Sequence, residues 1–542
     1  MAAAKQIPYD LANTRRSYSM LRQSPAFVVL VIVIADALQL ADPDLWSHLR
    51  AGQIILSTRH LILYDQFSYT AFGQLWRNHE WLLQVVMAAL YDHLDVFGLK
   101  LLKLLCAAAT ISFIALGMAE TVAPARVQRA LLLVIALALV AQIEFRPQIA
   151  TYALLSLLMA LLARDTYGTR VRLWPLIPMF ALWANLHGGY AVGLAGLATY
   201  TAVVAVDTLR QRQGWGRGIR LAAITAACAL ATLANPEGTT VWRTFTHTVT
   251  NPVLHNGVAE WQPLLSRIGP EWHAYPPGVI IYLLPLALFV ALAVSVLLTP
   301  TMDDAALVAI AALFIIGAFV SCRNMALAVI ALSIPLAHHA GIAMNDASSH
   351  RVAGSIPETA GTESERLAAD PDRPFNPLLA GGLAIVIAVM SGLLSNRLAI
   401  DQHCPVDAVA FMKKHDLHGN VLGYYDWGNY LLWHVAPESK IFIDGRCDQV
   451  YSTRVATDYF DFDFGRPGAE SILDKYPNDF VLMPPDSKAY AIVGKNPGWK
   501  LIYRDLDAGL FARAGSPAAR LFAATDIAPR SDKSPAEQKL FP

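Results

Sequence analysis

About eleven apolar runs divide this sequence, and they restrict what the chain can fold into more than any other feature. A transmembrane helix needs about 20 apolar residues, or fewer where the bilayer thins. Only 15% of the 542 residues are charged, whereas soluble domains carry about 25%. We therefore expect a mainly α, polytopic membrane helix bundle. The runs lie at 25–41, 97–118, 129–144, 149–164, 172–185, 189–208, 219–235, 277–298, 304–321, 324–341 and 376–395.

The charged residues between the runs predict the sidedness of the chain. Lys5 and three arginines precede the first run with no cleavage site after it, so residues 1–24 are expected to be a cytoplasmic N-terminus. If 81–94 were counted as a further span, the arginines after Ala163 and after Leu209 would lie on the outer side of the membrane, against the positive-inside rule. An amphipathic helix at the membrane interface restores the positive-inside rule, and we adopt that interpretation.

With this topology the unusual polar clusters fall on the outer face of a transmembrane domain at 25–398, whose first outer loop is 42–96. Ionisable groups at membrane depth are functional candidates by default. The clusters are Asp42, Asp44 and His48; Asn78, His79 and Glu80; Glu144, Arg146 and Gln148; Asn185 and His187; Asn235 and Glu237; Glu260 and Gln262; and Arg323 and Asn324.

The pattern of the sequence changes in its last quarter. Strand-like runs at 420–424, 440–443, 479–483, 500–503 and 509–512 alternate with helices, the first of which starts at Pro405. This pattern predicts an extracytoplasmic α/β domain at 399–529 with a partly parallel sheet. A polar inner linker is expected at 342–375, and a disordered tail at 530–542.

Asp42 and Asp44 leave the first apolar run and precede an amphipathic segment. Two carboxylates at a membrane surface can act as a general base, or can hold a divalent cation such as Mg²⁺ or Mn²⁺ that binds a phosphate. The alternative is that one of them only caps the following helix, as aspartate commonly does.

The other clusters carry similar alternatives. Arg146 either binds a phosphate through two N–H groups or is an interfacial arginine whose head group reaches water. His187 lies with Asn185 in a short turn before two glycines, where histidine is more often structural than catalytic. Arg323 interrupts an apolar stretch and is a candidate for function.

Signatures of soluble enzymes are missing, since the sequence contains no P-loop, no G-x-S-x-G and no H-E-x-x-H. The zero net charge excludes a global field that would draw the chain to nucleic acid. Cys404 and Cys447 are the two cysteines of the C-terminal domain. An oxidising compartment would favour a disulfide between them.

Together the motifs resemble the GT-C fold of membrane glycosyltransferases, which includes protein O-mannosyltransferases and aminoarabinose–lipid A transferases. The chain is most similar to a bacterial branch of GT-C-like membrane proteins. The shared motifs are DPDLWSHLRAG, NHEWLLQ, RPQ, NLHGG, NPEG and RN, followed by a C-terminal YDWGNYL and FIDGR. They cover nearly the whole chain in this order.

The resemblance implies inverting transfer of a sugar from a polyprenyl-phosphate carrier to an envelope glycan, lipid or protein acceptor at the outer face of a bacterial inner membrane. It aligns Asp44 with the catalytic acidic residue, whose carboxylate takes the proton from the acceptor hydroxyl, and gives Asp42 an assisting role. The resemblance also implies a set of substrate-binding residues: His48, His79, Glu80, Arg146, Gln148, Asn185, His187, Glu260 and Arg323. The chain has His79-Glu80 where better-known members often have His-Pro-Pro, which leaves the role of this pair open.

Two other classes of function stay open from the sequence. A transporter of lipid-linked sugars would be expected to show internal repeats and broken midplane helices, and neither is visible. A non-catalytic envelope assembly protein would use the C-terminal domain to recruit partners, and it would tolerate substitution of the first-loop aspartates.

Overall fold

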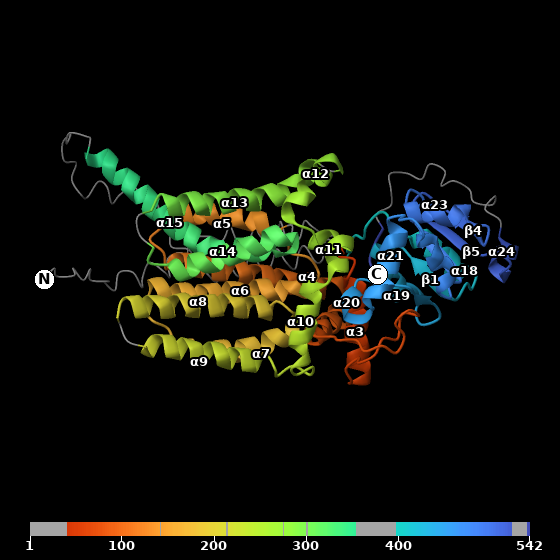
Figure 1. Cartoon of the computed structure of the whole chain (residues 1–542), viewed down its shortest axis with the longest axis horizontal. Coiled ribbons are helices and arrows are strands. Elements are labelled where there is room, and N and C mark those ends of the chain that lie inside the picture. The colour runs from red at the N-terminus through yellow and green to blue at the C-terminus, as the bar shows by residue number, and fades with distance from the viewer. Residues whose placement is uncertain are drawn as a thin grey trace.

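The computed structural model describes residues 41–140, 142–212, 215–274, 276–299, 302–353, 397–522 and 539–542. A bundle of helices that run roughly side by side meets a smaller domain containing a β-sheet at one end (Figure 1). The expected spans at 25–41 and 376–395 lie outside the described residues. The helices of the bundle end are α3 (Leu45–Thr58), α10 (Thr240–Thr250), α11 (Pro252–Gly257) and α12 (Leu264–Ala274). The long helices are α4 (Trp81–Ala119), α5 (Ala125–Val140), α6 (Gln148–Tyr167), α7 (Leu176–Leu186), α8 (Tyr190–Arg210), α9 (Gly216–Ala231), α13 (Ile280–Leu297), α14 (Ala305–Val320) and α15 (Met325–Ala353).

Each of the nine remaining apolar runs forms one of these long helices. Among the described residues, five segments are long and apolar enough by themselves to cross a membrane, and α7 and α14 are shorter apolar helices. Burial differs strongly among them. The stretch Cys322–Met344 is 89% buried, whereas α13 has a mean hydropathy of 2.7 and is only 22% buried. A helix that is apolar all round yet uncovered by protein needs an apolar solvent, so α13 faces lipid and α15 forms the centre of the bundle.

The helix α4 contains a break at the position that the sequence predicts. Asp95 has φ 55° and ψ −148°, which no helical residue adopts, so Trp81–Leu94 and the rest of α4 are two helices joined at Asp95. The first of them packs against α3. The boundary between the expected interfacial helix and the expected span at 97–118 therefore agrees with the backbone.

The C-terminal domain holds a five-stranded sheet in the order β2-β1-β3-β5-β4. β1 pairs in parallel with β2 and β3, while β5 runs antiparallel to both β3 and β4. A partly parallel sheet is thus confirmed, and the strand positions agree with the expected ones to within two residues. The strands are β1 (Asn420–Gly423), β2 (Lys440–Ile441), β3 (Phe480–Met483), β4 (Trp499–Arg504) and β5 (Gly509–Arg513). The helices around it are α18 (Val406–Lys414), α19 (Gly428–Val435), α20 (Cys447–Val450), α21 (Thr453–Asp463), α22 (Ile472–Lys475), α23 (Lys488–Lys495) and α24 (Pro517–Leu521).

The first outer loop joins this sheet at its β2 edge. Ser68 forms a parallel bridge with Ile441, and the backbone of Ile441 donates to Phe67 and accepts from Tyr69, both at 3.1 Å. An edge strand leaves unpaired N–H and C=O groups that a further segment can satisfy. The loop therefore acts as an additional edge segment of the sheet and fixes the domain to the bundle.

Two expectations about irregular segments need correction. The inner linker was expected from residue 342, but α15 continues as helix to Ala353; residues 354–375 lie outside the described part. The tail was expected to be disordered to its end, yet Phe541 is buried against Trp46, Tyr91 and Trp433. Burial of an aromatic ring orders the last four residues because a large apolar side chain gains free energy by leaving water.

Candidate active site

Asp44 occupies the N-cap position of α3, but its side chain makes no capping hydrogen bond. Asp42 Oδ1 accepts instead from the Asp44 backbone N–H at 2.8 Å. The Asp44 carboxylate is directed toward other parts of the chain, with Oδ2 3.4 Å from Arg146 Nε and Oδ1 accepting a hydrogen bond from Asn429 Nδ2 at 2.7 Å. Helix capping therefore does not account for an aspartate at this position.

Arg146 is the cation nearest to both aspartates. It lies in the loop before α6, and its Nε is 2.6 Å from Asp42 Oδ2 and 3.6 Å from Glu144 Oε2. Its Nη1 donates to Glu260 Oε2 at 2.9 Å. With Asp44, four carboxylates surround this one guanidinium. Its charge is thus matched by the protein's own anions, which argues against the expectation that Arg146 is the main phosphate ligand.

Glu260 connects Arg146 to the second arginine of the site. It lies on the short 3₁₀ helix η1 (Ala259–Trp261), and its Oε1 forms an ion pair with Arg323 Nη1. The Arg323 guanidinium also lies 5.2 Å from the centre of the Trp261 ring, within the range of a cation–π contact. Arg323 is 31% exposed and Arg146 15%. Arg323 is therefore better placed to receive an anion from outside the protein.

A further carboxylate, that of Glu80, is surrounded by the imidazole rings of three histidines. His187 Nε2 lies 3.5 Å and His79 Nε2 3.7 Å from Glu80 Oε1, and His48 Nδ1 lies 3.9 Å from Oε2. Burial alone would raise the pKa of Glu80, but His79, His187, His48 and the cation Arg323 together lower it. Glu80 is thus an anion that orients histidine N–H groups.

The hydrogen bonds around His187 determine its tautomer. The backbone N–H of Gly189 donates to His187 Nδ1 at 3.0 Å, and Thr151 Oγ1, which already accepts from Trp183 Nε1, lies 2.8 Å from the same nitrogen. Because Nδ1 accepts, the proton is on Nε2, facing Glu80. Burial lowers the pKa of His187 to about 3. His187 is therefore a neutral donor, in part a structural one, as histidine in a tight turn often is.

The remaining predicted positions support these groups. Asn185 accepts from Trp81 Nε1 at 2.9 Å and donates to the backbone of Ala181 and Ala234, so it links α7 to α4. His48 Nδ1 lies 3.2 Å from Gln84 Nε2. Gln148 is buried at the first residue of α6. Residues predicted from separate outer-face clusters thus lie in one connected network of polar and electrostatic contacts: Asp42, Asp44, His48, Glu80, Arg146, Asn185, His187, Glu260 and Arg323.

Electrostatics distinguishes the carboxylates of this cluster. Burial, followed by the charge of Asp42, raises the pKa of Asp44 against the lowering effect of Arg146. Burial and the charge of Asp42 also raise the pKa of Glu144. The pKa of Glu260 is lowered, because its two arginine partners outweigh burial. Asp44 therefore binds a proton more readily than an ordinary aspartate, whereas Glu260 stays ionised between two arginines.

The C-terminal domain contributes two residues to the site that the sequence reasoning did not assign. Asn429, on α19, is 2% exposed and donates to Asp44. A Cβ atom on Gly445 would lie 2.1 Å from Asp44 Oδ1, so only glycine permits this close approach. Both lie inside the YDWGNYL and FIDGR motifs. The motifs were visible in the sequence, but nothing in them indicated contact with residue 44.

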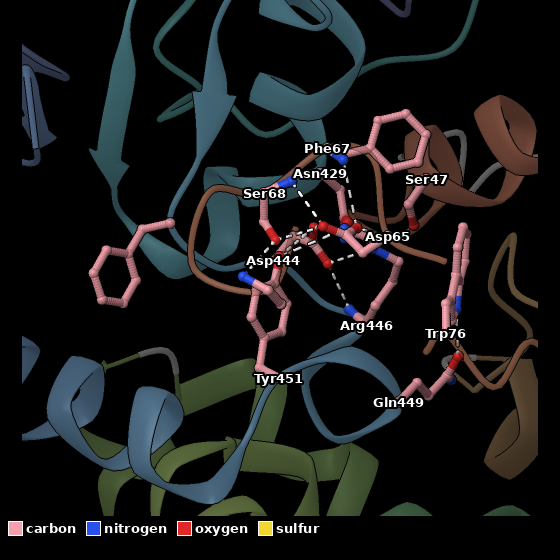
Figure 2. Close-up of polar contacts among 12 residues, drawn as sticks. Ser47, Asp65, Phe67, Ser68, Trp76, Asn429, Asp444, Arg446, Gln449 and Tyr451 are labelled. Atoms are coloured by element: carbon pink, nitrogen blue, oxygen red, sulfur yellow. Dashed lines mark hydrogen bonds and ion pairs between the residues drawn. The ribbon is translucent and has the colours of Figure 1, made fainter. Parts of the chain in front are cut away.

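A buried ion cluster holds this domain in place. Figure 2 shows Asp444, Arg446 and Asp65 converging beside Tyr451. Arg446 donates to both oxygens of Asp444, at 2.9 and 2.6 Å, and to Asp65 Oδ1 at 2.7 Å. Its guanidinium lies 4.6 Å from the Trp76 ring centre. Asp65 and Trp76 belong to the first outer loop, so Arg446 joins loop and domain.

The predicted disulfide is not formed: Cys404 and Cys447 are both buried, and no S–S bond joins them in the described structure. Cys404 precedes α18, where its backbone carbonyl accepts from Lys539 Nζ at 2.6 Å. Cys447 opens α20, which packs against α10 of the bundle. The two cysteines therefore lie on different elements, and the α/β layer does not bring them into a disulfide.

The described ranges contain no group of three or more His, Cys, Asp or Glu side chains arranged to hold a metal ion. Asp42 and Asp44, the pair expected to bind a cation, face Arg146. A divalent ion on these two carboxylates stays a prediction.

Comparison with solved structures places the fold. The oligosaccharyltransferase of Archaeoglobus fulgidus in its apo form is similar over 92% of this chain and 74% of its own, at 13% identity and a TM-score of 0.51. The chain has a GT-C fold. The expected resemblance is thereby confirmed at the level of the fold.

Two further structures are similar at lower scores. ArnT from Cupriavidus metallidurans bound to undecaprenyl phosphate is covered over 97% of its length at 12% identity and a TM-score of 0.42. Mycobacterial arabinofuranosyltransferase AftD is covered over 40% at 15% identity and a TM-score of 0.41. No family model and no curated protein matches the sequence.

Proposed function

We propose that this protein is a membrane glycosyltransferase that moves a sugar from a polyprenyl-phosphate carrier to the hydroxyl group of an envelope acceptor. The site faces the outer side of a bacterial inner membrane, the N-terminus is cytoplasmic and the C-terminal domain is extracytoplasmic. One observation carries the proposal. The Asp44 side chain makes no capping hydrogen bond to α3 and lies instead beside a series of ion pairs, Arg146–Glu260–Arg323, at one end of a GT-C bundle.

In this mechanism Asp44 acts as the general base. The acceptor hydroxyl oxygen attacks the anomeric carbon of the donor sugar, and its proton passes to the Asp44 carboxylate. The bond between that carbon and the phosphate oxygen breaks, and the electron pair leaves with the polyprenyl phosphate. A single displacement of this kind inverts the configuration at the anomeric carbon.

The leaving phosphate gains negative charge as the bond breaks, so cations and N–H donors stabilise the transition state. Arg323 serves this role because it is the more exposed arginine and has a single carboxylate among the ion pairs of the described residues. His79 is a second ligand, since its Nδ1 is buried without a hydrogen-bond partner in the described part of the chain. Asp42 and Glu260 assist by holding Arg146 in position.

A Mg²⁺ or Mn²⁺ ion on Asp42 and Asp44 remains part of the proposal only in a state where Arg146 moves away from Asp42. Their carboxylate oxygens are the type of ligand that these ions prefer. Calorimetric titration of Mn²⁺ into the detergent-solubilised protein and its Arg146→Ala variant tests this: binding seen only in the variant would show that the guanidinium takes the place of the cation.

Asp44→Asn tests the enzyme directly. The variant keeps the shape of the side chain and loses its basicity, and we expect at least a hundredfold loss of sugar transfer. The assay follows radiolabelled sugar leaving a panel of undecaprenyl-phosphate monosaccharides in liposomes. Asp416→Asn is the matched control, since Asp416 is 92% exposed and lies far along the chain in the C-terminal domain.

Each competing function predicts a different result. A scaffold would retain its assembly phenotype in Asp44→Asn, and the purified parent would turn over none of the donors. A transporter would move the intact labelled lipid across the liposome membrane. Either outcome, with a folded parent protein, would overturn the glycosyltransferase proposal.

A further inference from the structure

The contact between Asn429 and Asp44 joins residues 385 positions apart in the sequence. Asn429 is 2% exposed, and its Nδ2 donates to Asp44 Oδ1 at 2.7 Å. Arg146 lies on the other oxygen of the same carboxylate, 3.4 Å from Oδ2. The two oxygens of Asp44 are thus held by different parts of the chain, and the orientation of the carboxylate depends on both.

The packing around Asn429 keeps its side chain in place. α19 lies against α3, and the rings of Tyr430 and Trp46 meet edge to face with centroids 5.4 Å apart. A Cβ on Gly428 would lie 2.5 Å from the carbonyl oxygen of Ile443, so the start of α19 touches the FIDGR loop. Gly445 in that loop approaches both members of the pair, since its Cβ would lie 2.6 Å from Asn429 Nδ2.

The buried ion cluster of Asp65, Asp444 and Arg446, called the clamp below, fixes the FIDGR loop to the first outer loop. Asp65 accepts from Arg446 through Oδ1 and from Ser68 N and Oγ through Oδ2, at 2.9 and 2.6 Å. Tyr451 OH donates to Asp444 Oδ2 at 2.9 Å. Figure 2 shows Asn429 drawn close to this cluster. Residues on both sides of Gly445 are therefore immobilised by buried hydrogen bonds, and Gly445 with them.

The other half of the Asn429 amide is not used within the protein. Its Oδ1 is buried and has no hydrogen-bond partner among the residues that the structure describes. An unpaired buried acceptor costs about 1–3 kcal/mol. Beside the proposed base, this oxygen can accept a hydrogen bond from a donor group of a bound substrate.

We propose that Asn429 is a positioning residue of the transfer site, which orients the Asp44 carboxylate from the C-terminal domain and makes the docked domain part of the catalytic centre. This inference rests on the proposed function. Asn429 acts through Asp44, because its donor N–H favours the charged, proton-accepting form of the carboxylate. Its free Oδ1 then receives a second donor group of the acceptor molecule.

The first test titrates Asp44 without any turnover. Infrared difference spectra identify the carboxyl band that disappears in Asp44→Asn, and its pH midpoint is then measured in the parent and in Asn429→Ala. Loss of the N–H donor is expected to raise the midpoint by about one pH unit. An unchanged midpoint overturns the inference and leaves the proposed function untouched.

The second test uses activity. Asn429→Ala is expected to lower kcat tenfold or more with little change in the KM for the lipid donor, and to move the acidic limb of kcat to higher pH. Asn429→Asp, which adds a negative charge beside Asp44, is expected to be worse. Gly445→Ala displaces the pair without removing a polar group and should also lower kcat.

Tyr69→Phe is the matched control. It deletes the 2.5 Å hydrogen bond from Tyr69 OH to Asn478 Oδ1, which joins the same two parts of the chain away from Asp44. We expect the pH midpoint of Asp44 to be unchanged in this variant and its kcat to stay within twofold of the parent. If Tyr69→Phe and Asn429→Ala reduce kcat equally and with the same pH profile, domain docking alone explains the effect and the inference fails. A parent without any transfer would contradict the proposed function instead.

Discussion

Arg146 Nε lies 2.6 Å from Asp42 Oδ2, which connects the loop before α6 to the segment that precedes α3. The charge of Arg146 is therefore used inside the protein. Its role is to hold the acidic residues of the first outer loop at a fixed distance from Glu260, and hence from Arg323. In the proposed mechanism, contact with the phosphate falls to Arg323.

Arg323→Ala is expected to weaken binding of undecaprenyl phosphate by about tenfold to a hundredfold, since a hydrogen bond to a charged group contributes about 1.5–3 kcal/mol. Arg323→Lys keeps the charge and should recover part of the affinity, although it loses the planar fork. Microscale thermophoresis with undecaprenyl phosphate in detergent measures both. Arg466→Ala is the control, because Arg466 forms an exposed pair with Asp461 on the C-terminal domain. Equal affinities for parent and Arg323→Ala would exclude Arg323 as the phosphate ligand.

The pH dependence of transfer should report the raised pKa of Asp44. A carboxyl group acts as a base only when ionised, so activity is present above its pKa and is lost as the pH falls through it. Burial, with the added effect of Asp42, places this pKa above the ordinary value of 3.8. The acidic limb of kcat/KM is therefore expected at a higher pH than an ordinary aspartate would give. Asp42→Asn removes one raising charge and should shift the limb to lower pH; a shift in the other direction would contradict this assignment.

Sidedness follows from the direction of a single helix. Gln148 begins α6 beside Arg146, and Tyr167 ends it at the opposite end of the bundle. If Asp44 faces outward, a reporter after Thr169 stays in the cytoplasm, and so does one at Gly214, whereas one after Arg397 is exported. Alkaline phosphatase and green fluorescent protein fusions give complementary readouts. Phosphatase activity at Gly214 would reverse the proposed topology.

The sequence predicted the parts of the fold that depend on local pattern. Apolar runs predicted the helices, and the arginine bias separated Trp81–Leu94 from the following span at the residue, Asp95, where the backbone breaks. Alternating strands and helices predicted a partly parallel sheet. Each of these is encoded within about twenty consecutive residues.

Long-range relationships were not predictable in this way. Nothing in YDWGNYL indicates that Asn429 contacts Asp44, or that Arg446 contacts Asp65, since pairing across hundreds of residues depends on tertiary packing. A sequence shows the charge of Arg146 but not the four carboxylates around it, and the binding of phosphate by Arg146 stays a prediction. The disulfide failed for the same reason, as the Cα separation of two cysteines is a tertiary property.

The last prediction concerns the clamp between the domains. Asp65 and Asp444 are 2% or less exposed, and Arg446 is 5% exposed. Arg446→Ala leaves two buried carboxylates without their shared cation, and breaking a buried ion pair in this way typically costs about 3–5 kcal/mol. We expect a clear fall in the thermal transition of the C-terminal domain and faster proteolysis at its junction with the bundle. Arg446→Met, with Asp65→Asn and Asp444→Asn added, removes all three charges together and should restore much of the stability. Transfer activity of that triple variant then separates the two roles of the clamp. Recovery of both stability and kcat would show that the clamp only holds the domain, whereas stability without kcat would show that the ion cluster also sets the position of Gly445 and, through it, of Asp44.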